Sequence, residues 1–191
     1  LRADLTSAEL LLEPLAWSKA PGRPATLQLD IAKGTKYKTE LQNVRLVGED
    51  IAVEGWMGLD GANRLREFVF PDFSVNVVSR LEMRGEIKSD NVWDIRVKGQ
   101  TFDGREFFRS LFSVGRLSER QQAARGAKPS SGIDLRAEFD TVLGHSEVSL
   151  KGLKLSASKR GEKLTALVAR GTVDGGAALD VGVQQPANEA R

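Results

Sequence analysis

The chain has 191 residues, and its 28% charged and 40% hydrophobic residues are ordinary values for a globular protein with room for one large all-β domain or two small ones. The 28 basic and 26 acidic residues give a net charge of +2, which indicates a mixed surface and excludes the basic footprint of a nucleic-acid-binding protein. Cysteine is absent, so disulfides and thiolate metal sites are excluded, and no run approaches the roughly 20 apolar residues of a transmembrane helix.

The first part of the chain predicts two strands separated by a loop. Residues 5–12 are mostly apolar and predict a first strand that ends at Pro14. Residues 19–24, K-A-P-G-R-P, predict a loop, because two prolines and a glycine cannot hold a strand ladder. Residues 27–31 alternate between apolar and polar and predict a second strand. The sequence starts at Leu1 in what already resembles a strand, so we expect it to be a piece of a longer protein.

Residues 41–77 carry the clearest pattern of the chain. Apolar residues alternate with polar residues or glycine in three or four runs joined by tight turns, which is typical of a β-meander with one apolar face. A motif L-x-x-Φ-x-Φ, where Φ is apolar, begins at Leu41 and Leu65 and again at Leu5 and Leu150. The two-residue gap shifts the parity of an alternating strand, and a β-bulge makes that shift while the apolar side chains stay on one face. The four copies predict a curved, strongly twisted antiparallel sheet.

A hairpin and a helix are expected after this meander. Residues 80–98 predict a hairpin that turns at residues 89–91, S-D-N. The apolar spacing then becomes helical over residues 102–115, with Asp103 as a candidate N-cap and Gly115 as a candidate C-cap. This region predicts one short amphipathic helix.

The organisation is therefore two similar β units with a polar connection. Residues 1–115 form the first β-meander unit, which ends in the short helix, and residues 116–132 form a polar linker or loop. Residues 133–183 form a second β-meander unit, and residues 184–191 form a polar tail. The copies of the motif at residues 41 and 150 align, so the two units resemble versions of one another.

The sequence offers few groups for catalysis. His145 is the only histidine and stands between two expected strands, which favours a turn residue over a catalytic one. Without cysteine or a second histidine, a histidine-based metal site or a conventional catalytic triad lacks parts. No phosphate-binding loop motif occurs. We therefore predict a protein that is not an enzyme, with no catalytic residues, no metal site and no cofactor.

The expected apolar face allows two interpretations. A curved sheet that is not closed by a second sheet presents a groove, and apolar area exposed to water is unfavourable by roughly 25 cal/mol per Å². An acyl chain would suit such a groove, since each buried methylene contributes about 0.8 kcal/mol. The other interpretation is an ordinary packed β core, and periodicity alone favours it because most apolar strand faces are cores.

Four segments resemble the AsmA-like family, and most closely the C-terminal part of the large YhdP-type envelope proteins of Gram-negative bacteria, which are bridge-like lipid transfer proteins. They are residues 4–26, D-L-T-S-A-E-L-L-L-E-P-L-A-W-S-K-A-P-G-R-P-A-T; residues 41–48, L-x-x-V-x-L-x-G; residues 55–61, G-x-x-x-x-D-G; and residues 99–112, G-Q-T-F-D-G-R-E-F-F-R-S-L-F. The likeness covers most of the first 112 residues and, more loosely, the second meander. The polar residues 116–132 depart from the repeat.

The resemblance implies a periplasmic segment of an inner-membrane-anchored protein that passes phospholipids between the inner and outer membranes along a hydrophobic β groove. It implies as partners phospholipid acyl chains, other segments of the same longer chain and other envelope proteins, and no nucleic acid. The alternative function is a structural or interaction scaffold with a filled β core in outer-membrane assembly. The apolar parity of the clearest strands predicts the groove lining, which is Leu27, Leu29, Ile31, Ile51, Val53, Met57, Leu59, Val75, Val77, Trp93, Ile95 and Val97.

Overall fold

The computed structural model describes residues 1–12, 17–105, 132–144, 148–161, 163–174 and 176–185. Its described elements are all β-strands, which confirms the all-β prediction. The expected amphipathic helix lies almost entirely outside the described residues, as do His145 and most of the expected linker. Asp103 is the last residue of a strand, and its carboxylate accepts a hydrogen bond from the backbone amide of Arg105 at 3.3 Å.

The described residues form thirteen strands. They are β1 (Arg2–Asp4), β2 (Leu10–Leu12), β3 (Trp17–Lys19), β4 (Ala25–Ala32), β5 (Thr39–Gly48), β6 (Ile51–Leu59), β7 (Leu65–Val75), β8 (Ser79–Ile87), β9 (Val92–Asp103), β10 (Gly132–Leu143), β11 (Ser149–Arg160), β12 (Lys163–Val173) and β13 (Ala178–Gln184).

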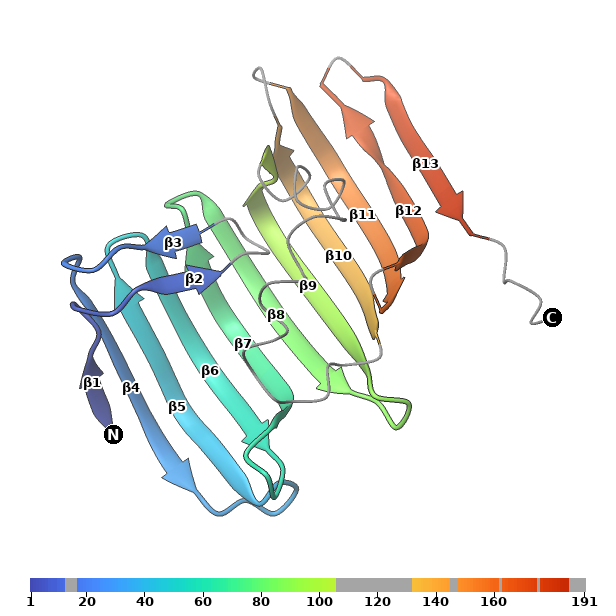
Figure 1. Ribbon diagram of the computed structural model, residues 1–191. Coiled ribbons are helices and arrows are strands. Elements are labelled where there is room, and N and C mark those ends of the chain that lie inside the picture. The colour runs from blue at the N-terminus through green and yellow to red at the C-terminus, as the bar shows by residue number, and fades with distance from the viewer. Residues whose placement is uncertain (13–16, 106–131, 145–147, 162, 175, 186–191) are drawn as a thin grey trace.

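Eleven of these strands form a single sheet, shown in Figure 1 as a broad row of strands from blue to red. The order is β1-β4-β5-β6-β7-β8-β9-β10-β11-β12-β13, so both predicted units contribute strands to the same sheet. Neighbours are antiparallel except β9 and β10, which are parallel. Parallel strands cannot be joined by a tight turn, so the chain returns over a long connection between residues 103 and 132. Strands β2 and β3 form a separate two-stranded sheet.

The register of the ladders shifts in the middle of several strands, where the sequence motif predicted bulges. On β5 the shift lies between Leu41 and Val44, and Asn43 has a φ of 50°. On β11 it lies between Lys151 and Lys154, and Gly152 has a φ of 60°. A left-handed residue is one way to form a bulge, and a bulge bends its strand. These two predicted bulges are confirmed.

The other two copies of the motif differ from each other. At Leu65 the pairing of β6 with β7 also shifts, between Gly58 and Leu59 of β6. At Leu5 the prediction is wrong, because the residues after β1 turn away from the sheet instead of extending it. There the amide of Thr6 donates to the Asp4 carboxylate at 2.8 Å and the amide of Ala8 donates to the Leu5 carbonyl at 3.0 Å. Such a local side-chain bond competes with strand pairing.

Turns join the antiparallel strands at both ends of the sheet. The turn between β6 and β7 is held by Asp60, whose carboxylate accepts hydrogen bonds from the backbone amides of Ala62 and Arg64. The Arg64 backbone amide, followed by its side chain, lowers the pKa of Asp60 to about 2. The predicted turn at residues 89–91 joins β8 to β9, with Asn91 at a φ of 62°.

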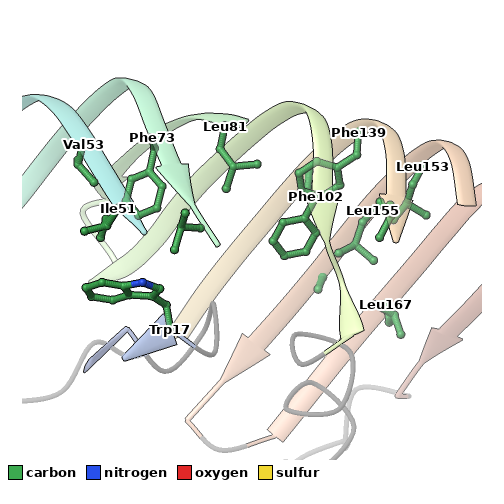
Figure 2. Close-up of a cluster of buried hydrophobic side chains, with 14 residues drawn as sticks. Trp17, Ile51, Val53, Phe73, Leu81, Phe102, Phe139, Leu153, Leu155 and Leu167 are labelled. Atoms are coloured by element: carbon green, nitrogen blue, oxygen red, sulfur yellow. The ribbon is translucent and has the colours of Figure 1, made fainter. Parts of the chain in front are cut away.

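The strands bend, and the buried apolar side chains lie on the inside of the bend, as Figure 2 shows for Val53, Phe73, Leu81 and Leu153. We call this side of the sheet the inner face and the opposite side the outer face. The rings of Phe102 and Phe139 stack with centroids 4.8 Å apart within the same cluster. The core of the molecule therefore sits on one face of one bent sheet.

Candidate functional site: the inner face of the sheet

The ladder register places the predicted lining residues on the inner face, with one exception. Val53 pairs with Phe73 and Ile51 with Val75, and these side chains belong to the buried cluster. The members on β4, β6, β7 and β9 share this face, and they are Leu27, Leu29, Ile31, Ile51, Val53, Met57, Leu59, Val75, Trp93, Ile95 and Val97. Their role as a ligand lining remains a prediction.

The exception is Val77. It lies in the turn after β7, with a φ of 63°, and its side chain is 69% exposed. Alternation continued from Phe73 and Val75 predicted an inward side chain, but the strand ends at Val75. Val77 therefore does not belong to the inner face. A β-branched residue with positive φ is unusual and is tolerated here only by the turn geometry.

One row of side chains on the inner face crosses ten neighbouring strands without a polar residue. Each member pairs with the next through the ladders, and the parallel pairing of Ile95 with Leu135 continues the row. We call this the long apolar row; its members, from β4 to β13, are Ile31, Leu41, Met57, Phe68, Gly85, Ile95, Leu135, Ala157, Leu167 and Val183. At roughly 4.8 Å between strands, nine spacings extend about 43 Å.

Glycine at position 85 leaves room for an aromatic side chain within this row. A Cβ atom there would stand 2.5 Å from Cε1 of Phe68, which is too close for any real contact. The Phe68 ring in turn lies against Phe70, with centroids 5.4 Å apart, and against Trp93, with centroids 5.8 Å apart. Aromatic rings therefore cover the centre of the inner face, and the Phe68 ring occupies the space that the missing side chain of Gly85 leaves free.

The first strands of the chain cover one end of the inner face. We call this the capped end, where the small β2–β3 sheet lies across the ends of the main strands near the β5–β6 turn (Figure 1). Trp17 of β3 is 5% exposed and faces Ile51 in Figure 2, while Leu10 and Leu12 of β2 pack against the same cluster. Beneath this cover the inner-face side chains are almost completely buried; Ile51, Val53, Phe73 and Val75 are 1–6% exposed.

A buried lysine fixes the cover in place. Lys19, at the end of β3, is 3% exposed, and its ammonium group donates to the carbonyls of Thr6, Ala8 and Ala20 at 3.2, 2.7 and 3.1 Å. A buried charge needs such partners, because removing it from water without hydrogen bonds is very unfavourable. Lys19 therefore ties β3 to the loop that precedes β2. Its positive charge also contributes to the lowered pKa of Asp4, after the hydrogen bonds from Thr6.

The opposite end of the inner face lacks such a cover among the described residues, and we call it the open end. Met57, Phe68, Trp93 and Ile95 are only partly buried there. Ile31, also at this end of its strand, is 63% exposed. The same apolar face is thus a packed core at the capped end. At the open end it is partly exposed over β6, β7 and β9, whereas Ala157 and Leu167 of the long apolar row are buried, at 8% and 4% exposed.

On the outer face, behind the open end, charged side chains of neighbouring strands form ion pairs. Asp94 lies between Trp93 and Ile95 on β9 and points to the outer face, yet it is 5% exposed. Its carboxylate accepts hydrogen bonds from Arg136 at 3.0 Å and forms ion pairs with Lys88 at 3.3 Å and Arg96 at 3.4 Å. Burial raises the pKa of Asp94, but the hydrogen bond from Lys88 and the charges of Arg136 and Lys88 outweigh it, so the net pKa is lowered.

A second outer-face carboxylate, that of Asp134, lies beside Asp94 where β9 and β10 pair in parallel. The register pairs Asp134 of β10 with Asp94 of β9. Asp134 accepts hydrogen bonds from Arg160 at 2.8 Å and Ser158 at 2.9 Å, and the Arg160 bond is the main reason why its pKa is lowered. The carboxylates of Asp94 and Asp134 would repel each other, so their contacts with Arg136 and Arg160 stabilise the parallel pairing of β9 with β10.

A hollow of about 440 Å³ lies across β7 to β11 where the strands bend. Its lining combines exposed basic and acidic side chains, which are Asp72, Arg80, Glu82, Lys98, Glu138, Asp140 and Lys154. None of these residues is a buried polar group directed into the hollow. The mixed charge gives it no preference for one class of ligand.

Sequence reasoning missed the part of the inner face that the second unit contributes. Leu135, Ala157, Leu167 and Val183 complete the long apolar row but were not among the predicted lining residues. Alternation on their strands could have found them. The position of Leu135 opposite Ile95, through which the other three join the row, depends on the parallel pairing, which has no local signal.

The described part of the chain contains no cluster of three or more His, Asp or Glu side chains able to hold a metal ion. Within the same ranges, no helix combines the length and the apolar composition required to span a membrane. Comparisons with protein-family models, with curated proteins and with solved structures found no match to this chain.

Proposed function

We propose that this chain is a non-catalytic segment of an AsmA-like periplasmic protein, anchored at the inner membrane, whose inner face carries phospholipid acyl chains between the inner and outer membranes. The long apolar row is the observation that supports this proposal. It offers a path about 43 Å long perpendicular to the strands. The family and its location rest on the sequence motifs, and the partners are other segments of the longer chain and envelope proteins.

The partly exposed open end is where an acyl chain binds. Apolar area left in water there is unfavourable by roughly 25 cal/mol per Å², and a ligand removes that penalty. A fatty acyl chain of ordinary length gains on the order of 10 kcal/mol gross from burial, which offsets its extraction from a bilayer. The mechanism is passive: the chain slides over Met57, Phe68 and Ile95 without specific polar contacts, and the head group stays in water.

The test is lipid binding by a variant with a charge on the open end. Ile95→Asp places a carboxylate in the middle of the long apolar row, at a partly buried position that tolerates it better than a core position would. Native mass spectrometry of the purified chain, with lipid extraction, should show phospholipid on the parent protein and at least a tenfold loss on the variant. Far-UV circular dichroism must show that both fold.

A matched control places the same charge on the outer face. Val168 is 37% exposed and pairs with Ser156 on the outer side of β11, so Val168→Asp leaves the inner face unchanged. This variant should bind phospholipid like the parent. Equal lipid on the folded Ile95→Asp variant, or no lipid on the parent, would contradict the proposal. In the full-length protein, the Ile95→Asp change should block phospholipid transport.

The capped end favours the second function, a scaffold module with a filled core in outer-membrane assembly. Ile51, Val53, Phe73 and Val75 are as buried as an ordinary protein core, and no ligand is needed to cover them. If the parent protein carries no lipid and unfolds cooperatively as a monomer, this function becomes the better explanation.

A further inference from the structure

The inner face contains one charged residue at its open end. The register pairs Lys159 of β11 with Ile133 of β10 on one side and with Leu164 of β12 on the other, and Ile133 pairs with Trp93. Among the paired inner-face positions of the described strands, Lys159 is the only ionisable residue. Its row is followed by only one more paired row, that of Gly132 and Arg160, before the strands end, and Lys159 is partly buried.

The nearby carboxylates are bound to other basic groups on the opposite side of the sheet. Asp134 pairs with Arg160 at 2.8 Å, and Asp94 pairs with Arg136 at 3.0 Å and with Lys88 at 3.3 Å. No described side chain forms an ion pair with the ammonium group of Lys159. A lysine within an apolar row packs its methylene stem against its neighbours and extends its ammonium group to the rim, where the charge remains available to a ligand.

The rim at this end is basic. The turns after β4, β6 and β8 all lie at the open end and carry more basic than acidic residues, namely Lys33, Lys36, Lys38, Arg64 and Lys88 against Asp60 and Asp90. At the other end, the described turn residues between β5 and β6 and between β12 and β13 carry Glu49, Asp50 and Asp174. Arg23, in the turn between β3 and β4, forms ion pairs with Glu49 and Asp50 at 3.8 and 3.7 Å. The described residues of the three turns at the open end therefore carry a net positive formal charge, although Lys36, Arg64 and Lys88 are paired with Glu67, Asp60 and Asp94.

We propose that Lys159 is a head-group site: its ammonium group binds the phosphate of an anionic phospholipid whose acyl chains lie on the inner face. This inference rests on the function proposed above and specifies the ligand. Lysine binds phosphate as a point charge with up to three donors. The apolar row beside it takes the acyl chains, so one amphiphilic ligand satisfies both parts of the surface. Charge complementarity with the rim selects a head group with net negative charge over a zwitterionic one.

The experiment compares the binding of two lipids that have the same acyl chains and different head groups. The purified chain is incubated with vesicles of an equimolar mixture of dioleoyl phosphatidylglycerol and dioleoyl phosphatidylcholine, and bound lipid is quantified by native mass spectrometry. The parent protein should bind the anionic lipid with a preference of about threefold or more, as expected for a partly exposed ion pair. Lys159→Met should bring the ratio close to one, and Lys159→Arg should retain the preference.

Lys154→Met is the matched control. Lys154 lies on the same strand but is exposed on the outer face, so its loss removes one positive charge without touching the inner face. Circular dichroism checks that each variant folds, and Lys159→Gln replaces Lys159→Met if that variant does not. The preference of the parent should also fall at high salt, because salt screens an exposed ion pair.

The outcomes separate this inference from the function on which it rests. Absence of both lipids from the parent protein would overturn the proposed function and, with it, the head-group site. Binding of both lipids without preference, or a preference that persists in Lys159→Met, would overturn the head-group site alone. If Lys154→Met loses the preference for the anionic lipid to the same extent as Lys159→Met, the preference comes from net charge. That outcome would also overturn the head-group site.

Discussion

The capped and open ends of the inner face have the same apolar character but different surroundings. At the capped end, Trp17 and the β2–β3 sheet cover side chains such as Val53 and Val75, which are 5% and 1% exposed. At the open end, Trp93 and Ile95 continue the same face but stay partly exposed. The comparison teaches that the sheet alone does not decide whether an apolar face is a core. What covers it decides this, and at the open end none of the described residues supplies a cover.

The largest expected difference between the two ends is in their tolerance of a buried charge. Val53→Asp places a carboxylate in the packed cluster without a partner, and we expect a loss of about 4 kcal/mol or more in the free energy of unfolding. Ile95→Asp at the open end should lose only about 1–2 kcal/mol, because water reaches the side chain. Urea unfolding followed by circular dichroism measures both. Similar losses would mean that the two ends are one continuous core.

A smaller effect is expected from removing the aromatic cover. Trp17→Ala removes the indole that packs on Ile51, and we expect a loss of about 3 kcal/mol, as for other buried tryptophans. Trp93→Ala, which removes a partly exposed indole, should lose about half as much. If Trp93→Ala is the more destabilising variant, the open end is packed by the chain itself and the assignment of the two ends is wrong.

The smallest effect concerns the outer face behind the open end. Asp94 has a lowered pKa in the folded state, so its contribution to stability is present above the unfolded pKa of about 4 and is lost as the pH falls through the folded value. Asp94→Asn should lose about 1–2 kcal/mol at pH 7, where its hydrogen bonds to charged partners are made. This difference from the parent should shrink as the pH falls below about 4 and disappear below the folded pKa of Asp94.

Asp140→Asn is the control for this measurement. Asp140 is exposed on the outer face, and the described residues give it no ion pair, so the variant should match the parent at every pH. Chemical unfolding as a function of pH provides the comparison. A difference between Asp94→Asn and the parent that does not shrink as the pH is lowered below about 4 would show that the carboxylate acts through its shape and not through its charge.

The local features of the sheet follow from short stretches of sequence. Alternation over a few residues located strands such as β4, β6 and β9, and the motif at Leu41 and Leu150 located two bulges, because parity shifts and left-handed residues are encoded within the strand. The same local reasoning was wrong where a turn intervened, at Leu5 and at Val77, since alternation says nothing about where pairing stops. Almost all of the predicted lining therefore lies on one face.

Which strands are neighbours, and which part of the apolar face is covered, depends on long-range contacts. The parallel pairing of β9 with β10 joins residues about 40 positions apart, and it alone aligns Ile95 with Leu135 and Asp94 with Asp134. The cover of the capped end depends on Lys19, whose three carbonyl partners come from a loop with no strand pattern. Periodicity cannot show these features because it reports the order of side chains along one strand, whereas cover and pairing depend on contacts between segments that are distant in the sequence.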